Sequence, residues 1–110
     1  MKIKTSELKG AALDWAVAKA WQPVYSDGAI LVAVVQGDYH PSTDWSFGGP
    51  IIEREKITIM CPSTGDFWDA RVNTFPPVYW RGETPLIAAM RCYVASKLGD
   101  EVEIPEELVA

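Results

Sequence analysis

Two stretches of the chain carry apolar residues at the three- and four-residue spacing of an amphipathic helix. In the first, about residues 6–21, Leu8, Ala12 and Trp15 fall on one face. Thr5 or Ser6 can cap the opening turn, where backbone N–H groups need an acceptor. The pattern therefore predicts a first helix that buries one of its faces.

The second helical stretch, about residues 85–98, has the clearest boundaries in the sequence. Thr84 is a suitable N-cap, and Gly99 stands where such a helix ends. Between them, Met90 and Val94 fall on the apolar side. We expect these two side chains to pack against a sheet.

Shorter apolar stretches predict strands. Residues 29–35 are almost all apolar, which is typical of a strand buried on both faces. Residues 56–61 alternate apolar and polar side chains, and 67–72 follow after a short turn, so these two predict a hairpin. Residues 101–104 are suited to an edge strand. The expected fold is α+β, a small and mostly antiparallel sheet with the two helices packed on it.

Two further segments show neither helical nor strand periodicity. Residues 37–50 are rich in Gly, Pro, Ser and Asp, and residues 73–83 combine prolines with aromatic residues. Irregular segments as long as the first are frequently functional. Nothing in the sequence divides the chain, so we expect residues 1–110 to form a single domain with an acidic tail at 100–110.

The net charge of −5 comes from the C-terminal end. Residues 100–110 hold five acids and no base, which leaves ten acids and ten bases in the rest of the chain. Because no basic stripe is available for a phosphate backbone, direct nucleic-acid binding is not expected. No apolar run has the length of a membrane span, and the first residues lack the apolar stretch of a signal peptide, so we expect a cytoplasmic protein.

The content of apolar residues is high for a chain of this size. Hydrophobic residues make up 48% of the sequence and include five tryptophans. A small domain has a large surface for its volume and hides so many apolar side chains with difficulty. We therefore expect a homo-oligomer, most simply a two-fold dimer.

Residues that commonly carry catalysis are few. The single histidine, His40, stands near no nucleophile motif. Together with Asp38 and Asp44 it makes the tightest group of metal-ligand types, but the spacing does not match a zinc site. Cys61 and Cys92 are expected to be buried free thiols. We predict no catalytic residues, no metal and no cofactor, which favours a binding protein over an enzyme.

The loop 41–55, which begins inside the long irregular segment, offers the first candidate ligand site. Trp45 can stack on a flat ring, Arg54 can pair with a phosphate or carboxylate, and Asp44 can accept a hydrogen bond from a sugar. The candidate residues are Asp44, Trp45, Phe47, Gly48, Gly49 and Arg54. The alternative interpretation is structural, with Trp45 and Phe47 filling the core and Arg54 paired with a neighbouring glutamate.

The second candidate site lies at the entry to the second helix and comprises Trp80, Arg81 and Thr84. A helix N-terminus presents free N–H groups and a positive dipole end, which suit an anion. Glu83 is itself an anion at this position, so an ordinary capped helix start is the alternative.

Three long strings of residues are specific enough to compare with known families. They are KTSELKGAALDWAVAKA at 4–20, PSTDWSFGGPIIERE at 41–55 and TPLIAAMRCYVASKLGDEVEIPEEL at 84–108. Together they resemble the NinX-like family of lambdoid phage accessory proteins, which has no settled biochemical activity. The resemblance implies a phage-encoded protein in the cytoplasm of the infected bacterial host, where accessory proteins often modify the host or blunt its defences.

These observations favour stoichiometric binding. The first hypothesis is a small anionic or nucleotide ligand used in host defence, and the alternative is a host protein that this chain inhibits or modulates. A second alternative is a small hydrolase with paired carboxylates, either Glu53 with Glu55 or Asp66 with Asp69. A pocket lined by Trp45 and Arg54 would favour the ligand, whereas a flat exposed apolar patch would favour the host protein.

Overall fold

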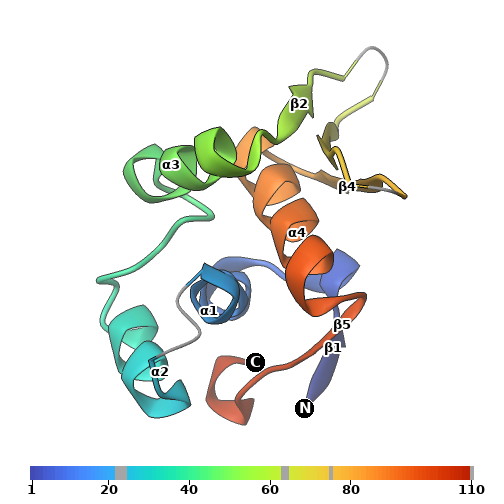
Figure 1. Ribbon diagram of the computed structural model, residues 1–110. Coiled ribbons are helices and arrows are strands. Elements are labelled where there is room, and N and C mark those ends of the chain that lie inside the picture. Colours follow the sequence, from blue (N-terminus) through green and yellow to red (C-terminus); the bar gives the residue numbers. More distant parts are fainter. Residues whose placement is uncertain (22–24, 63–64, 75, 110) are drawn as a thin grey trace.

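The computed structural model describes residues 1–21, 25–62, 65–74 and 76–109. Within these residues the chain forms four α-helices and two antiparallel sheets (Figure 1), which confirms the predicted α+β class. The helices are α1 (Gly10–Trp21), α2 (Asp27–Val35), α3 (Trp45–Glu55) and α4 (Pro85–Leu98). One sheet pairs β1 (Lys2–Lys4) with β5 (Glu101–Glu103), and the other has the order β2 (Thr58–Met60), β3 (Trp68–Val72), β4 (Val78–Gly82).

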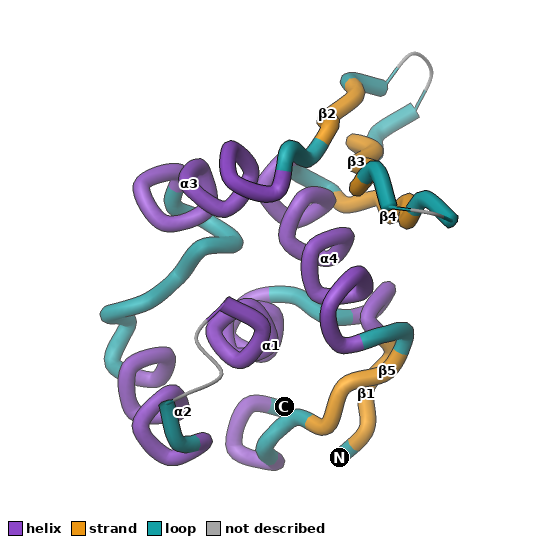
Figure 2. The backbone as a smooth tube through the Cα atoms, viewed as in Figure 1, coloured by secondary structure: helices purple, strands orange, loops and turns teal. Residues whose placement is uncertain are grey.

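Helix α4 lies at the centre of the molecule, with the three-stranded sheet on one side and α1 on the other (Figure 2). It begins and ends where the sequence predicted, and the Thr84 side chain caps it by accepting from the Ile87 N–H at 3.1 Å. Met90 and Val94 are completely buried, as expected. A helix with neighbours on both sides needs apolar residues around most of its circumference, and α4 has them.

The three-stranded sheet has two unlike faces because successive side chains of a strand point in opposite directions. The predicted hairpin is confirmed as β2 and β3, and both strands are shorter than the predicted ranges. The inner face packs on α4 and carries Ile59, Ala70, Val72, Val78 and Trp80. The opposite side chains form what we call the outer sheet face: Thr58, Met60, Asp69, Arg71, Tyr79 and Arg81.

The third strand of this sheet, β4, was not predicted. Its residues lie inside the segment 73–83, which was expected to be irregular. The alternation of Val78 and Trp80 with exposed Tyr79 and Arg81 is that of a half-buried strand. This signal spans only a few residues between a pair of prolines and a glycine, which hid it.

The predicted strand at 29–35 is wrong, because these residues belong to helix α2. An all-apolar run of this length fits a buried strand and a short helix equally well. The deciding signal lies before it: Ser26 caps the helix by accepting from the Ala29 N–H at 3.2 Å, and Asp27 places an acid in the first turn. Ile30 and Val34 are buried against the core, whereas Val32 and Val35 are exposed.

The expectation of an irregular segment at 37–50 is wrong for its second half, which starts helix α3 at Trp45. Asp44 is its N-cap, and Ile51 is buried on its inner side. Pro50 inside the helix removes one backbone hydrogen bond, and glycine and proline together argued against a helix in the sequence.

Helix α1 begins at Gly10 rather than at residue 6. Thr5 opens a 3-10 turn instead, and its buried hydroxyl donates to the Gly99 carbonyl oxygen at 2.7 Å. This bond ties the beginning of the chain to the end of α4. The predicted edge strand at 101–104 is confirmed as β5, whose partner β1 was not foreseen.

The two cysteines lie in different environments. Cys92 on α4 is buried and donates to the Val78 carbonyl oxygen at 3.1 Å, and burial raises the pKa of its thiol to about 11. Cys61 follows β2 and is exposed, so the expectation of two buried thiols is wrong for it.

Candidate functional site

The amino ends of α3 and α4 lie side by side and line one groove of about 270 Å³. The groove brings together Trp45 and Thr84, which were predicted for two separate sites. Trp45 is 52% exposed and therefore does not fill the core. Thr84 uses its hydroxyl as the cap of α4. The remaining walls of the groove come from Ser42, Thr43, Pro85, Leu86 and Ile87.

Asp44 and Phe47 hold the start of α3 in place. The Asp44 carboxylate accepts from the Ser46 N–H at 2.8 Å and the Ser46 hydroxyl at 2.7 Å, and these hydrogen bonds lower its pKa. Phe47 is half-buried, with its ring edge-on to Tyr39 and to His40 at centroid distances of 5.2 and 5.1 Å. Both residues therefore have structural partners within the protein.

The two glycines of α3 have different surroundings. Gly48 is buried, and a side chain there would meet Leu86 and the Pro41 carbonyl oxygen. Gly49 has open space around its Cα, with no atom within 4 Å of an added Cβ. Gly48 is therefore required for close packing of α3, and Gly49 is not.

Arg54 lies at the opposite end of α3 from Trp45. Its guanidinium stacks over the Trp21 ring at 3.7 Å from the centroid, and its Nε donates to Glu55 at 3.1 Å. Lys97 of α4 pairs with the same carboxylate at 3.2 Å. Burial alone would raise the pKa of Glu55, but the hydrogen bonds from Arg54 and Lys97 outweigh it and hold the pKa below its ordinary value. Arg54 thus joins α3 to α1, and Glu55 joins α3 to α4.

Trp80 and Arg81 are neighbours in β4 but point to opposite faces of the sheet. Trp80 packs against the core beneath the sheet. Arg81 is exposed, and its Nε lies 3.5 Å from the Asp69 carboxylate on the next strand. The predicted residues therefore divide among a groove, a helix junction and the two faces of a sheet.

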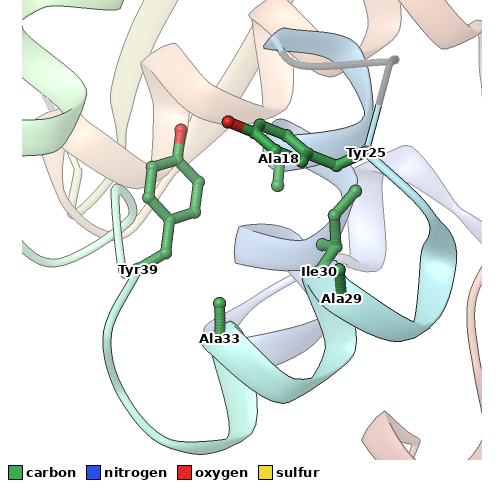
Figure 3. A pocket seen from close by; sticks show the side chains of 6 residues that line it. All are labelled: Ala18, Tyr25, Ala29, Ile30, Ala33 and Tyr39. Carbon is green, nitrogen blue, oxygen red and sulfur yellow. The ribbon is translucent and has the colours of Figure 1, made fainter.

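An apolar surface on α2 was not predicted as a site. A hollow of about 280 Å³ lies beside this helix, with Tyr39 on one side, Tyr25 on the other, and Ala29, Ile30 and Ala33 along the helix (Figure 3). Next to the hollow, Val32 and Val35 are 54% and 64% exposed. We call Tyr25, Ala29, Val32, Ala33 and Val35 the α2 surface. The uninterrupted run of apolar residues was its signal in the sequence, and the strand interpretation concealed it.

A buried carboxylate supports the loop between α2 and α3. Asp14 of α1 is 5% exposed and accepts from the Ser42 N–H at 2.8 Å. Burial raises the pKa of Asp14, and the contacts with Ser42 oppose this shift without cancelling it. The Ser42 hydroxyl lies near this carboxylate but does not reach hydrogen-bonding geometry with any described residue.

Asp14→Asn is expected to stabilise the protein at neutral pH. Because the folded pKa lies above the ordinary 3.8, the carboxyl contributes most stability below that value, and the contribution is lost as the pH rises through the folded pKa. Asparagine cannot ionise, and its Oδ1 can still accept from Ser42. Thermal melts should show a Tm advantage over wild type that grows between about pH 3 and pH 7. An advantage that is constant with pH would contradict this assignment.

Among the described residues, no group of three or more His, Cys, Asp or Glu side chains could hold a metal ion. In the same part of the chain, no helix is both long enough and apolar enough to cross a membrane.

Comparison with known proteins identifies the family. No curated protein sequence matches the chain. The family model described as "Bacteriophage P22, NinX" matches residues 4–97, which include α1, α2, α3, the whole three-stranded sheet and all of α4 except its last residue, Leu98. The chain therefore belongs to the NinX-like family of bacteriophage proteins.

Proposed function

We propose that this protein acts by stoichiometric binding to a host protein in the cytoplasm of the infected bacterium, and that it docks through the α2 surface. The observation that carries this proposal is the exposure of α2. Its residues from Ala29 to Val35 are all apolar, yet Ile30 and Val34 alone are buried in the core. A helix that is apolar all round is normally covered on all sides.

The shape and charge of the α2 surface suit an apolar partner. The ridge formed by Val32 and Val35 stands beside the hollow between Tyr25 and Tyr39, so a partner meets both a projection and a recess. The charged residue of the helix, Asp27, is paired with Lys19. A partner that presents branched apolar side chains without charge fits this surface, because no ion needs to be desolvated on either side.

Val32→Asp is expected to weaken partner binding at least tenfold, since it places a carboxylate where apolar contacts form. The wild type and the variant are each used to capture proteins from infected cells. Mass spectrometry then identifies the proteins that the wild type retains and the variant does not. The purified partner is then titrated by calorimetry, which should give a simple whole-number stoichiometry and the loss of affinity for Val32→Asp.

The matched control is Met60→Asp, which adds the same charge at another exposed apolar position. Equal affinity of both variants for the purified partner would overturn the α2 surface as the docking site. Light scattering of the purified protein tests a second copy as the occupant. If the wild type is a dimer and Val32→Asp dissociates it, the α2 surface is the dimer interface of the homo-oligomer expected from the composition. That result would overturn the host-protein proposal.

The other hypotheses have less support at the predicted residues. A small anionic or nucleotide ligand was expected between Trp45 and Arg54, and these lie at opposite ends of α3. A carboxylate hydrolase needs an acid free to move protons, whereas Glu55 is engaged by Arg54 and Lys97. Asp69 is likewise paired, with Arg81.

A further inference from the structure

The outer sheet face carries charged and aromatic side chains in two rows across the strands. The register places Thr58 opposite Arg71 and Arg71 opposite Tyr79, so these three form one row. Side chains directly opposite on one face have their Cβ atoms about 5 Å apart. The sheet lies at the far side of α4 from α1 and α2 (Figure 2), so this row is remote from the α2 surface.

Arg71 is the anomaly of this face. It lies on the central strand, and its Nε is buried, yet no described residue accepts a hydrogen bond from it. A buried donor without an acceptor destabilises a fold, and such groups are few in native structures. Arg81, by contrast, is paired with Asp69. Among the described residues, the Arg71 guanidinium therefore has no hydrogen-bond or ion-pair partner, and its planar fork matches a phosphate.

Tyr79 supplies the second element of the row. Its side chain is 55% exposed, although tyrosine is a large aromatic residue in a small protein. An exposed ring on a sheet is a platform on which a flat heterocycle can stack. On the other side of Arg71, Thr58 brings a hydroxyl group suited to a phosphate or sugar oxygen.

Size and charge decide which ligand fits. The three strands span about 10 Å across the sheet, and the five residues of β3 span roughly 17 Å along it. The area of this sheet face is therefore far below the ~800 Å² that each partner contributes to a stable protein interface. A nucleic-acid strand requires several cations for its phosphates, whereas the described part of this face holds one arginine without a partner, Arg71, on a chain of net charge −5. A free nucleotide needs one cation and one ring.

We propose that the outer sheet face binds a free nucleotide, with its base on Tyr79 and its phosphate on Arg71. This site is separate from the α2 surface, so a nucleotide and a protein partner can be bound independently. The two proposals can fail independently as well: Val32→Asp should bind nucleotide as the wild type does.

The test is a titration of the ¹⁵N-labelled protein with AMP, followed by NMR. We expect saturable shifts of the Arg71 Nε–H signal and of the β3 and β4 amides, with a Kd of about 1 mM or lower. Arg71→Gln should weaken binding at least tenfold, and Tyr79→Leu about three- to tenfold. Arg71→Lys should fall between wild type and Arg71→Gln, because it keeps the charge and loses the fork.

Lys9→Gln is the matched control, since it removes one exposed positive charge before α1 and should leave the affinity unchanged. Tyr79→Leu keeps the test decisive if Arg71→Gln does not fold. No shift at about 10 mM AMP, or shifts confined to the Trp45 groove, would overturn the proposal. If adenosine alone or inorganic phosphate alone binds as tightly as AMP, the face does not recognise ring and phosphate together, and the proposal is overturned. Much tighter binding of a ten-nucleotide oligodeoxyadenylate would assign the face to nucleic acid and overturn a free nucleotide.

Discussion

Val94→Asp is expected to unfold the protein at room temperature. Val94 is completely buried in α4, between the sheet and α1, and no described base lies among the buried residues around it. An unpaired carboxylate in such a place costs several kcal/mol even after relaxation, which is a large part of a total stability of about 5–15 kcal/mol. Circular dichroism at neutral pH should show loss of helical signal and of a cooperative thermal transition.

Val32→Asp is the control for this prediction, because it makes the same substitution in a helix at a position that is 54% exposed. Its effect on stability should stay within about 1 kcal/mol. If Val94→Asp melts within a few degrees of Val32→Asp, the central position of α4 is wrong.

Gly48→Ala is expected to lower stability by about 1–3 kcal/mol, the usual effect of forcing a methyl group into a packed core. An added Cβ would lie 2.6 Å from Leu86 Cδ2 and 2.7 Å from the Pro41 carbonyl oxygen. The leucine can rotate away, but the carbonyl belongs to the backbone and must move with its loop. For a domain of this size the expected decrease in Tm is roughly 5–15 °C.

Gly49→Ala separates this steric effect from helix propensity. The two glycines are adjacent in α3, and an added Cβ at Gly49 meets nothing within 4 Å. Alanine favours a helix over glycine by about 1 kcal/mol, so Gly49→Ala should raise the Tm by a few degrees. A rise for both variants would show that α3 does not approach Pro41 and Leu86 as closely as described.

The elements that sequence reasoning found are those whose local signals agree. For α4, the cap at Thr84, the apolar spacing and the stop at Gly99 all indicate one helix. For α2, the signals conflict, because β-branched residues favour a strand while the cap at Ser26 favours a helix. Tertiary packing decides such cases, and it favoured the helix.

The sequence allowed individual candidate residues to be named, but not which of them lie together in space. Trp45 and Thr84 meet because α3 packs beside α4, a contact between distant parts of the chain. Trp45 and Arg54 cannot meet because a helix with a rise of 1.5 Å per residue holds them about 14 Å apart. In a loop, Trp45 and Arg54 could approach each other, but the α3 helix separates them.

Pairing of β1 with β5 imposes an order on folding. Ile3 and Val102 face each other across this sheet, and nearly all of the described chain lies between them. During synthesis β1 leaves the ribosome before β5, which is made about a hundred residues later. The closure of so long a loop is slow compared with local helix formation. The β1–β5 sheet is therefore the last element to form. A truncated product that stops before Glu101 would leave β1 unpaired and accessible to quality-control proteases.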